Sequence, residues 1–133
     1  IAGLSYAEML KAALDAKDKT NVRDFQLALA QNLELLKLNP FMAQKHVGSD
    51  LSGGEKKKME VLQILMLKPK LIFLDEIDSG LDTKSASLIS KILRDYQIKN
   101  HASFIVITHN KKILENFVIN KSYQLKNKTL VAL

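Results

Sequence analysis

The sequence contains no cysteine and no tryptophan, and only 6% of its residues are aromatic. Without cysteine, the chain itself forms no disulfide, no thiolate zinc site and no Cys-ligated cluster. No apolar run reaches the roughly 18 residues that a membrane-spanning helix needs, and the first ten residues lack the basic segment of a secretory signal peptide. We therefore expect a cytoplasmic protein that does not insert into a membrane.

Glycine is also scarce, with five residues at positions 3, 48, 53, 54 and 80. None of them lies in the pattern G-x-x-x-x-G-K-[ST], the loop whose backbone amides and lysine cradle nucleotide phosphates. The 133 residues therefore lack a phosphate-binding loop (P-loop) of their own.

What the chain does contain is typical of a globular domain: 47% hydrophobic and 26% charged residues over 133 positions. The formal net charge is +6, from 20 basic and 14 acidic residues. The lysines are spread along the chain rather than gathered on one segment. We interpret them as a solvated surface and do not expect a nucleic-acid partner.

The hydrophobic pattern changes near residue 67. Before it, apolar residues recur at helical spacing and predict helices over 5–17, 22–37 and 53–67. Ser5 and Glu8 form a capping box at the first helix. The second half of the third helix is apolar on all sides, which predicts that it is buried.

After residue 67, short apolar runs alternate with helical patterns. The runs 71–74 and 103–107 predict strands buried on both faces, with a helix over 83–98 between them. This order is that of a βαβ unit with parallel strands. A short helix over 111–116 and two weaker strands over 117–125 and 129–133 complete the prediction.

Two segments carry residues suited to nucleotide chemistry. Ser52, Gly53 and Gly54 open a helix, where backbone amides and the helix dipole favour a phosphate. Ser52 and Glu55 also form a capping box, so this segment is equally a plain helix start. Asp75 and Glu76 end the first strand, where a carboxylate can hold Mg²⁺ and its neighbour can activate water.

Two further segments follow in the same order along the chain. Ser79-Gly80-Leu81-Asp82 forms a turn in which Asp82 can cap the next helix. His109 follows the second strand and should lie at the same sheet edge as Asp75 and Glu76. His46 and His101 have no such context, and we interpret them as surface residues.

Together, these residues resemble the ATP-binding-cassette (ABC) ATPases. Ser52-Gly53-Gly54 is similar to their signature loop, and Leu71 to Asp75 to their Walker B strand. The resemblance implies that Glu76 is the catalytic glutamate and His109 the switch histidine. It also implies ATP and Mg²⁺ as cofactors, with Asp75 on the metal, Asp82 in the D-loop, and a second cassette that joins in a homodimer on ATP binding.

The runs LSGGEKKK and LDEIDSGLD resemble one branch in particular, the SufC-like ATPases of the SUF system for iron–sulfur cluster assembly. This resemblance implies scaffold subunits of the SufB and SufD type as partners, and a cytoplasmic or plastid-stromal location. Transporter cassettes more often carry LSGGQ and a Pro-Thr pair where this chain has Ile77-Asp78. A transporter nucleotide-binding subunit and a non-hydrolysing binding fragment stay open as alternatives.

The expected fold class is α/β, a partial P-loop NTPase fold. Residues 1–67 would form the helical subdomain with the signature helix, and residues 68–133 the C-terminal part of the RecA-like core. The resemblance implies that the P-loop lies upstream, on a strand beside residues 103–107. We therefore expect the strand over 103–107 to have an exposed apolar edge, which favours self-association.

Overall fold

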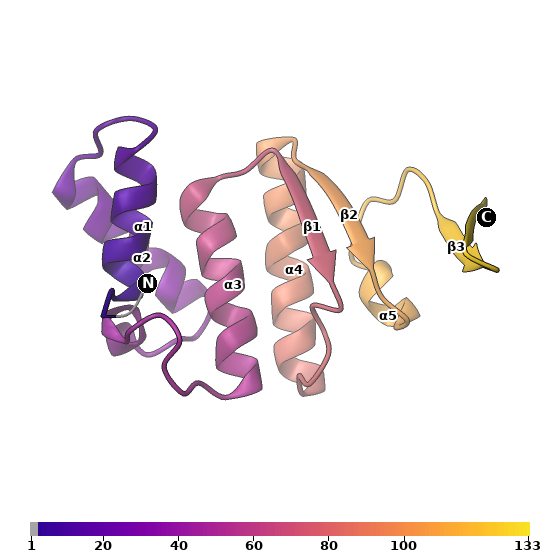
Figure 1. The fold of residues 1–133 in the computed structure, drawn as a ribbon, viewed down its shortest axis with the longest axis horizontal. Coiled ribbons are helices and arrows are strands. Elements are labelled where there is room, and N and C mark those ends of the chain that lie inside the picture. The colour runs from indigo at the N-terminus through magenta and orange to yellow at the C-terminus, as the bar shows by residue number, and fades with distance from the viewer. Residues whose placement is uncertain (1–2) are drawn as a thin grey trace.

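The computed structural model describes residues 3–133, apart from the side chains of Lys111 and Lys112. Ile1 and Ala2, the first residues of the expected helical subdomain, lie outside the described residues. Figure 1 shows helices at the N-terminal end, a pair of strands in the middle and a hairpin at the C-terminal end. In chain order the elements are α1 (Tyr6–Asp15), α2 (Val22–Leu35), the 3-10 helix η1 (Pro40–Gln44), α3 (Gly53–Leu67), β1 (Leu71–Asp75), α4 (Thr83–Asn100), β2 (Ser103–Ile107), α5 (Lys111–Leu114), β3 (Tyr123–Lys126) and β4 (Thr129–Ala132).

Local signals in the sequence explain where the helices begin. Ser5 and Ser52 both form complete capping boxes, with Glu8 and Glu55 respectively. Asp82 accepts hydrogen bonds from the first backbone amides of α4. The predicted starts are therefore confirmed, while α1 and α2 end two residues earlier than predicted, within the fraying that is usual at helix ends.

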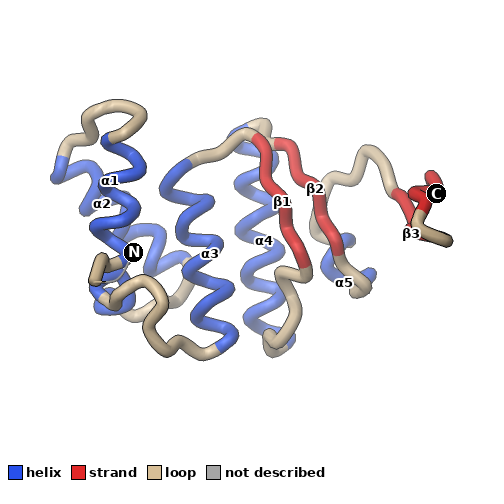
Figure 2. Tube along the Cα trace, viewed as in Figure 1, coloured by secondary structure: helices blue, strands red, loops and turns tan. Residues whose placement is uncertain are grey.

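The strands β1 and β2 form a parallel pair, as predicted (Figure 2). In their register Leu71 faces Ser103, Phe73 faces Ile105 and Asp75 faces Ile107. Beyond the last pair, the Glu76 amide donates to the Ile107 carbonyl at 2.9 Å, which extends the ladder by one bond. The helix α4 connects the two strands, so the predicted βαβ unit is present.

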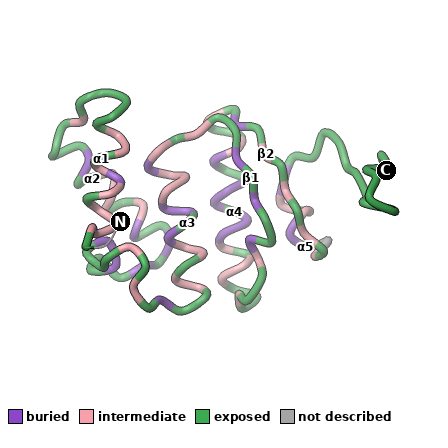
Figure 3. Tube along the Cα trace, viewed as in Figure 1, coloured by how far each residue is buried: buried purple, intermediate pink, exposed green. Residues whose placement is uncertain are grey.

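The prediction that both strands are buried on both faces is wrong. Ile72 and Leu74 are buried, but Leu71 and Phe73 are 55% and 65% exposed. On β2, Ile105 and Ile107 are exposed, while Phe104 and Val106 are half-buried. The reason is that, in the described part of the chain, the helices cover one face of this pair, and alternate side chains point to opposite faces. Figure 3 shows the resulting alternation.

One apolar cluster of buried residues runs from the N-terminal helices to the strands. It is centred on α3 and α4, where Val61, Leu62, Ile89 and Leu93 have no exposed surface. The prediction that the second half of α3 is fully buried is wrong in part. Ile64 and Leu67 are only half-buried, since they line a groove between α3 and β1.

The C-terminal segment differs from prediction over residues 117–122, which are not strand. Phe117 is buried beside Phe104, with ring centroids 5.7 Å apart. The Gln97 side chain exchanges two hydrogen bonds of 3.2 Å with the backbone of Val118. The strands β3 and β4 form an antiparallel hairpin whose residues are all exposed. Among the described helices, none is long and apolar enough to cross a membrane.

Candidate functional site

The carboxyl edge of β1 and β2 brings Asp75, Glu76 and His109 together, as the strand order predicted. Asp75 is the last residue of β1, and Glu76 follows it. His109 lies two residues after β2, and its Nδ1 is 3.2 Å from Glu76 Oε1. The two side chains are accessible, since 80% of the His109 side chain and 51% of the Glu76 side chain are exposed. An accessible carboxylate beside an imidazole is suited to accepting and passing on a proton.

The backbone of Glu76 adopts a left-handed conformation with φ of 45°. This conformation is uncommon for a residue with a β-carbon, and it costs of the order of 1 kcal/mol or more. The bond from its amide to Ile107 holds it in place. Because of this conformation, the Glu76 side chain does not continue the alternation of side chains between the two faces of β1.

A second hydrogen bond crosses between the same two segments. Thr108 Oγ1 donates to Asp78 Oδ1 at 3.2 Å, and the Asn110 amide donates to Thr108 Oγ1 at 3.0 Å. The sequence alone predicted no role for Thr108 or Asp78. A signal was present, since Thr108 directly precedes His109 and Asp78 is the third acid within four residues.

At the start of α3, the Ser52 side chain forms a complete capping box with Glu55. Ser52 Oγ accepts from the Glu55 amide at 3.3 Å and donates to Glu55 Oε2 at 2.9 Å. The Ser52 amide also donates to Glu55 Oε2, at 2.8 Å. These bonds hold the pKa of Glu55 below its ordinary value. The bond from the Ser52 amide has the largest effect, and the bond from the Ser52 hydroxyl the next largest.

The first turn of α3 lies against the loop that follows Glu76. A β-carbon added to Gly53 would be 4.0 Å from the Gly80 carbonyl oxygen, and one added to Gly54 would be 3.6 Å from Leu81 Cδ2. Gly80 has φ of 74°, so glycine is required there for its backbone freedom. Two of the predicted segments, 52–54 and 79–82, are therefore neighbours.

Asp82 acts as the N-cap of α4. Its Oδ1 accepts from the amides of Lys84 and Ser85 at 2.9 and 3.0 Å, and its Oδ2 accepts from the Ser85 hydroxyl at 2.7 Å. The Ser85 hydroxyl, followed by the backbone amides, holds the pKa of Asp82 below its ordinary value. Asp82 therefore carries a negative charge at neutral pH.

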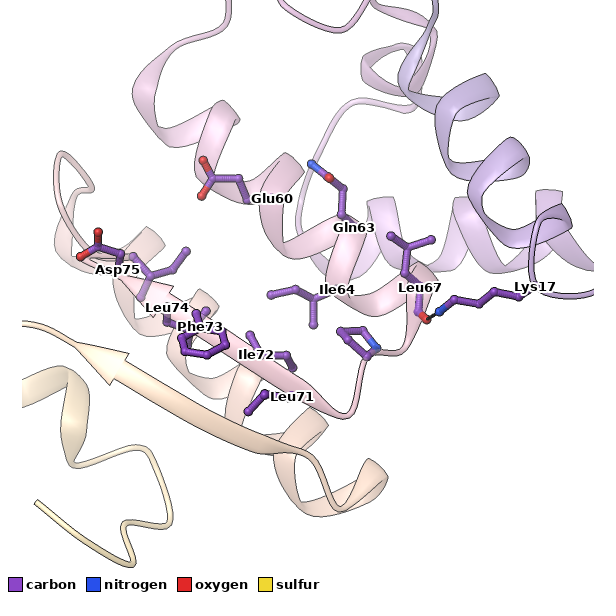
Figure 4. Close-up of a pocket in the computed structure, with 12 residues that line it drawn as sticks. Lys17, Glu60, Gln63, Ile64, Leu67, Leu71, Ile72, Phe73, Leu74 and Asp75 are labelled. Carbon is purple, nitrogen blue, oxygen red and sulfur yellow. Dashed lines mark hydrogen bonds between the residues drawn. The ribbon is translucent and has the colours of Figure 1, made fainter. Parts of the chain in front are cut away.

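A groove of about 430 Å³ lies between α3 and β1. Figure 4 shows Leu71 to Asp75 along one side, and Glu60, Gln63, Ile64 and Leu67 of α3 along the other. Asp75 lies at the end of this groove. The described residues contain no group of three or more His, Cys, Asp or Glu side chains that could hold a metal ion by themselves. The single carboxylate of Asp75 fits Mg²⁺, because Mg²⁺ is usually held by one or two carboxylates, with phosphates and water as its remaining ligands.

The family model described as "ABC transporter" matches residues 4–79. This match contains the signature segment, Asp75 and Glu76. The dimeric structure of MJ0796, a bacterial ABC transporter cassette, superposes with a TM-score of 0.72 at 21% identity, covering 88% of this chain and 51% of that one. The expected partial ABC ATPase fold, mixed α/β with a parallel strand pair, is therefore confirmed.

Two groups of relatives match by sequence. A "Probable ABC transporter ATP-binding protein" of Streptococcus pyogenes is 42% identical over 118 residues, which are 86% of this chain and 46% of that protein. "Iron-sulfur cluster assembly protein SufC" of Plasmodium falciparum is 38% identical over 114 residues, 81% of this chain and 33% of that protein. The chain thus spans less than half the length of these relatives. With a family model covering more than half of its residues, the chain belongs to the ABC transporter family of ATP-binding cassettes.

Proposed function

We propose that this chain forms part of an ATP-hydrolysing cassette, in which Glu76 is the general base and His109 its partner at the γ-phosphate. The observation that carries this proposal is the 3.2 Å approach of His109 Nδ1 to Glu76 Oε1 at the carboxyl edge of the strands. The water molecule that attacks the γ-phosphate gives its proton to Glu76 as the new P–O bond forms, while the bond from the γ-phosphorus to the bridging oxygen breaks and ADP leaves with that electron pair. His109 contacts the γ-phosphate and stabilises it as negative charge develops.

Asp75 would hold Mg²⁺, either directly or through a water molecule. When bound, the ion neutralises charge on the phosphates between which the bond breaks. Asp75 is exposed and ends β1 beside Glu76, so its carboxylate is accessible from the edge where the phosphates would lie.

The first turn of α3 would bind the γ-phosphate of an ATP molecule held by a second cassette. The first amides of a helix have no partner within the helix. The capping box uses the amides of Ser52 and Glu55, so those of Gly53 and Gly54 are the donors that face a ligand. Asp82, in the neighbouring loop, would couple this site to its counterpart across the dimer.

The phosphate cradle must come from outside these 133 residues, because they contain no P-loop pattern. ATP binding therefore needs a P-loop from the rest of the protein or from another chain. The alternative of a non-hydrolysing binding module follows if neither source exists.

Within the family, we propose a role in iron–sulfur cluster assembly, with SufB- and SufD-like scaffold subunits as partners. The runs LSGGEKKK and LDEIDSGLD support this role, as does the 38% identity to the protein named SufC. ATP-driven closure of two cassettes would then move the scaffold on which the cluster is built. A transporter subunit is the second candidate, favoured by the names of the 42% identical streptococcal relatives.

The test is reconstitution of the native protein with SUF scaffold subunits from the same source. The proposal predicts a stable complex on size-exclusion chromatography and cluster formation that depends on ATP. Failure to bind the scaffold, together with co-purification of membrane-embedded subunits, would contradict the SUF role and support the transporter alternative.

A further inference from the structure

The loop after Glu76 is joined to the end of β2 by one side-chain hydrogen bond. Thr108 Oγ1 donates to Asp78 Oδ1 at 3.2 Å, across 30 positions of sequence. Both residues are half-buried, so water competes less for this bond than for one on the open surface. The Thr108 hydroxyl is oriented by the Asn110 amide, which donates to its oxygen at 3.0 Å.

This bond lies next to the pair of residues proposed to react. Asp78 is two positions after Glu76, and Thr108 directly precedes His109. The backbone bond from the Glu76 amide to the Ile107 carbonyl, 2.9 Å long, joins the same two segments one step earlier. Two successive links, one backbone and one side chain, therefore fix the segment of Glu76 against that of His109.

The direct contact between Glu76 and His109 is poorly suited to fixing its own geometry. Both side chains are more than half exposed. Exposed ion pairs contribute little, because solvent screens them and both side chains lose conformational freedom when they pair. The separation of the two groups therefore depends on the segments that carry them.

The loop that carries Asp78 is itself well anchored. Ile77 is 4% exposed and belongs to the main apolar cluster. The Ser79 amide donates to the Glu76 carbonyl at 2.9 Å, and the Leu81 amide donates to the Asp78 carbonyl at 3.2 Å. Asp78 thus presents its carboxylate to Thr108 from a fixed backbone.

We propose that Asp78 is a positioning residue: its carboxylate oxygen holds Thr108 and thereby keeps His109 within hydrogen-bonding distance of Glu76. The expected effect on kcat rests on the proposed function. The expected effect on the hydrogen bond between His109 and Glu76 does not. What Asp78 supplies is a hydrogen-bond acceptor, so an amide oxygen at the same place should serve as well as a carboxylate.

The experiment compares four single variants of the native protein in steady-state ATP hydrolysis. Asp78→Ala and Thr108→Val remove the bond and should lower kcat about tenfold with KM unchanged. Asp78→Asn and Thr108→Ser keep an acceptor and a donor, and should stay within about twofold of wild type. The double variant Asp78→Ala/Thr108→Val should be no worse than the poorer single variant, since both changes remove the same interaction.

A second readout does not need catalysis. The ¹⁵N resonances of the His109 ring report whether Nδ1 is hydrogen-bonded. Asp78→Ala should shift them towards the values found in Glu76→Ala, whereas Asp78→Asn should leave them in place. Asp95→Ala, which removes an exposed acid from α4, is the control for a general loss of charge.

The outcomes separate this inference from the proposed function. If the wild type hydrolyses no ATP, the proposed function fails, and the ring resonances alone decide the inference. Wild-type kcat and unshifted resonances in Asp78→Ala would overturn it. So would an Asp78→Asn variant as impaired as Asp78→Ala, because the negative charge, rather than the acceptor, would then be what matters.

Discussion

At the scale of single residues, Ser52 has a structural task that is independent of any nucleotide. Its hydroxyl and amide both bond to Glu55 and close the first turn of α3. Ser52 also precedes Gly53 and Gly54, whose amides are proposed to bind a phosphate from a second cassette. Its stability effect and its catalytic effect must therefore be measured separately.

We predict that Ser52→Ala lowers the free energy of unfolding by about 1 kcal/mol, the usual effect of losing an N-cap hydroxyl. Urea denaturation of the protein measures this. Ser49→Ala is the matched control, because the Ser49 hydroxyl is buried and has no hydrogen-bond partner among the described residues. Removing the Ser49 hydroxyl should leave the free energy of unfolding unchanged or slightly higher. Equal losses in the two variants would contradict the capping role.

Four acidic residues have pKa values held below their ordinary range by hydrogen bonds to the charged form, namely Glu8, Asp15, Glu55 and Asp82. The unfolded chain binds protons at these groups at higher pH than the folded chain does. Their contribution to stability is therefore complete above about pH 5 and is lost as the pH falls through the lowered pKa values.

We therefore predict that the free energy of unfolding falls as the pH is lowered from about 5 to 3. Denaturation at a series of pH values measures the slope. Glu8→Gln/Glu55→Gln should make the slope shallower, because both capping-box carboxylates stop titrating. A slope that these two changes leave intact would show that other groups carry the acid sensitivity.

At the scale of elements, the helix starts and the parallel pairing of β1 and β2 were predictable because local residues specify them. Ser5, Ser52 and Asp82 are caps, and the apolar runs define the strands. The burial of the strands was not predictable, since it depends on what covers each face. The left-handed backbone of Glu76 and the Asp78–Thr108 bond arise from tertiary contacts between distant segments.

The helix α3 is the element on which both the core and the site depend. Leu62 has no exposed surface and belongs to the main apolar cluster. We predict that Leu62→Ala lowers the free energy of unfolding by about 2–5 kcal/mol, from lost burial and the cavity left behind. Leu27→Ala, at a 58% exposed position on α2, should change it by less than about 0.5 kcal/mol. Similar losses at the two sites would contradict the observed packing.

At the scale of the whole molecule, one face of β1 and β2 is an exposed apolar surface in the described residues. Leu71, Phe73, Ile105 and Ile107 lie on it, and the register sets Phe73 directly beside Ile105. In the described chain, β2 pairs with β1 alone, so its other edge offers unpaired backbone groups. The division into a helical subdomain and a RecA-like core at residue 67 stays a prediction.

We predict that the 133-residue chain by itself associates in a concentration-dependent way through this face. Sedimentation velocity over a range of concentrations measures it. Phe73→Glu should reduce the association, whereas Leu27→Glu, at a comparably exposed position on α2, should not. A strict monomer with a sharp, concentration-independent melt would contradict this expectation.

The proposed function depends on Glu76 acting as the base of an ATP-hydrolysing site. The most direct measurement is the ATP hydrolysis rate of the native protein that carries this chain, compared with its Glu76→Gln variant. This role of Glu76 predicts that Glu76→Gln lowers kcat by at least about 100-fold, because the attacking water loses its proton acceptor. It also predicts that the variant still binds ATP and dimerises. A Glu76→Gln variant that hydrolyses ATP at the wild-type rate would show that Glu76 is not the general base.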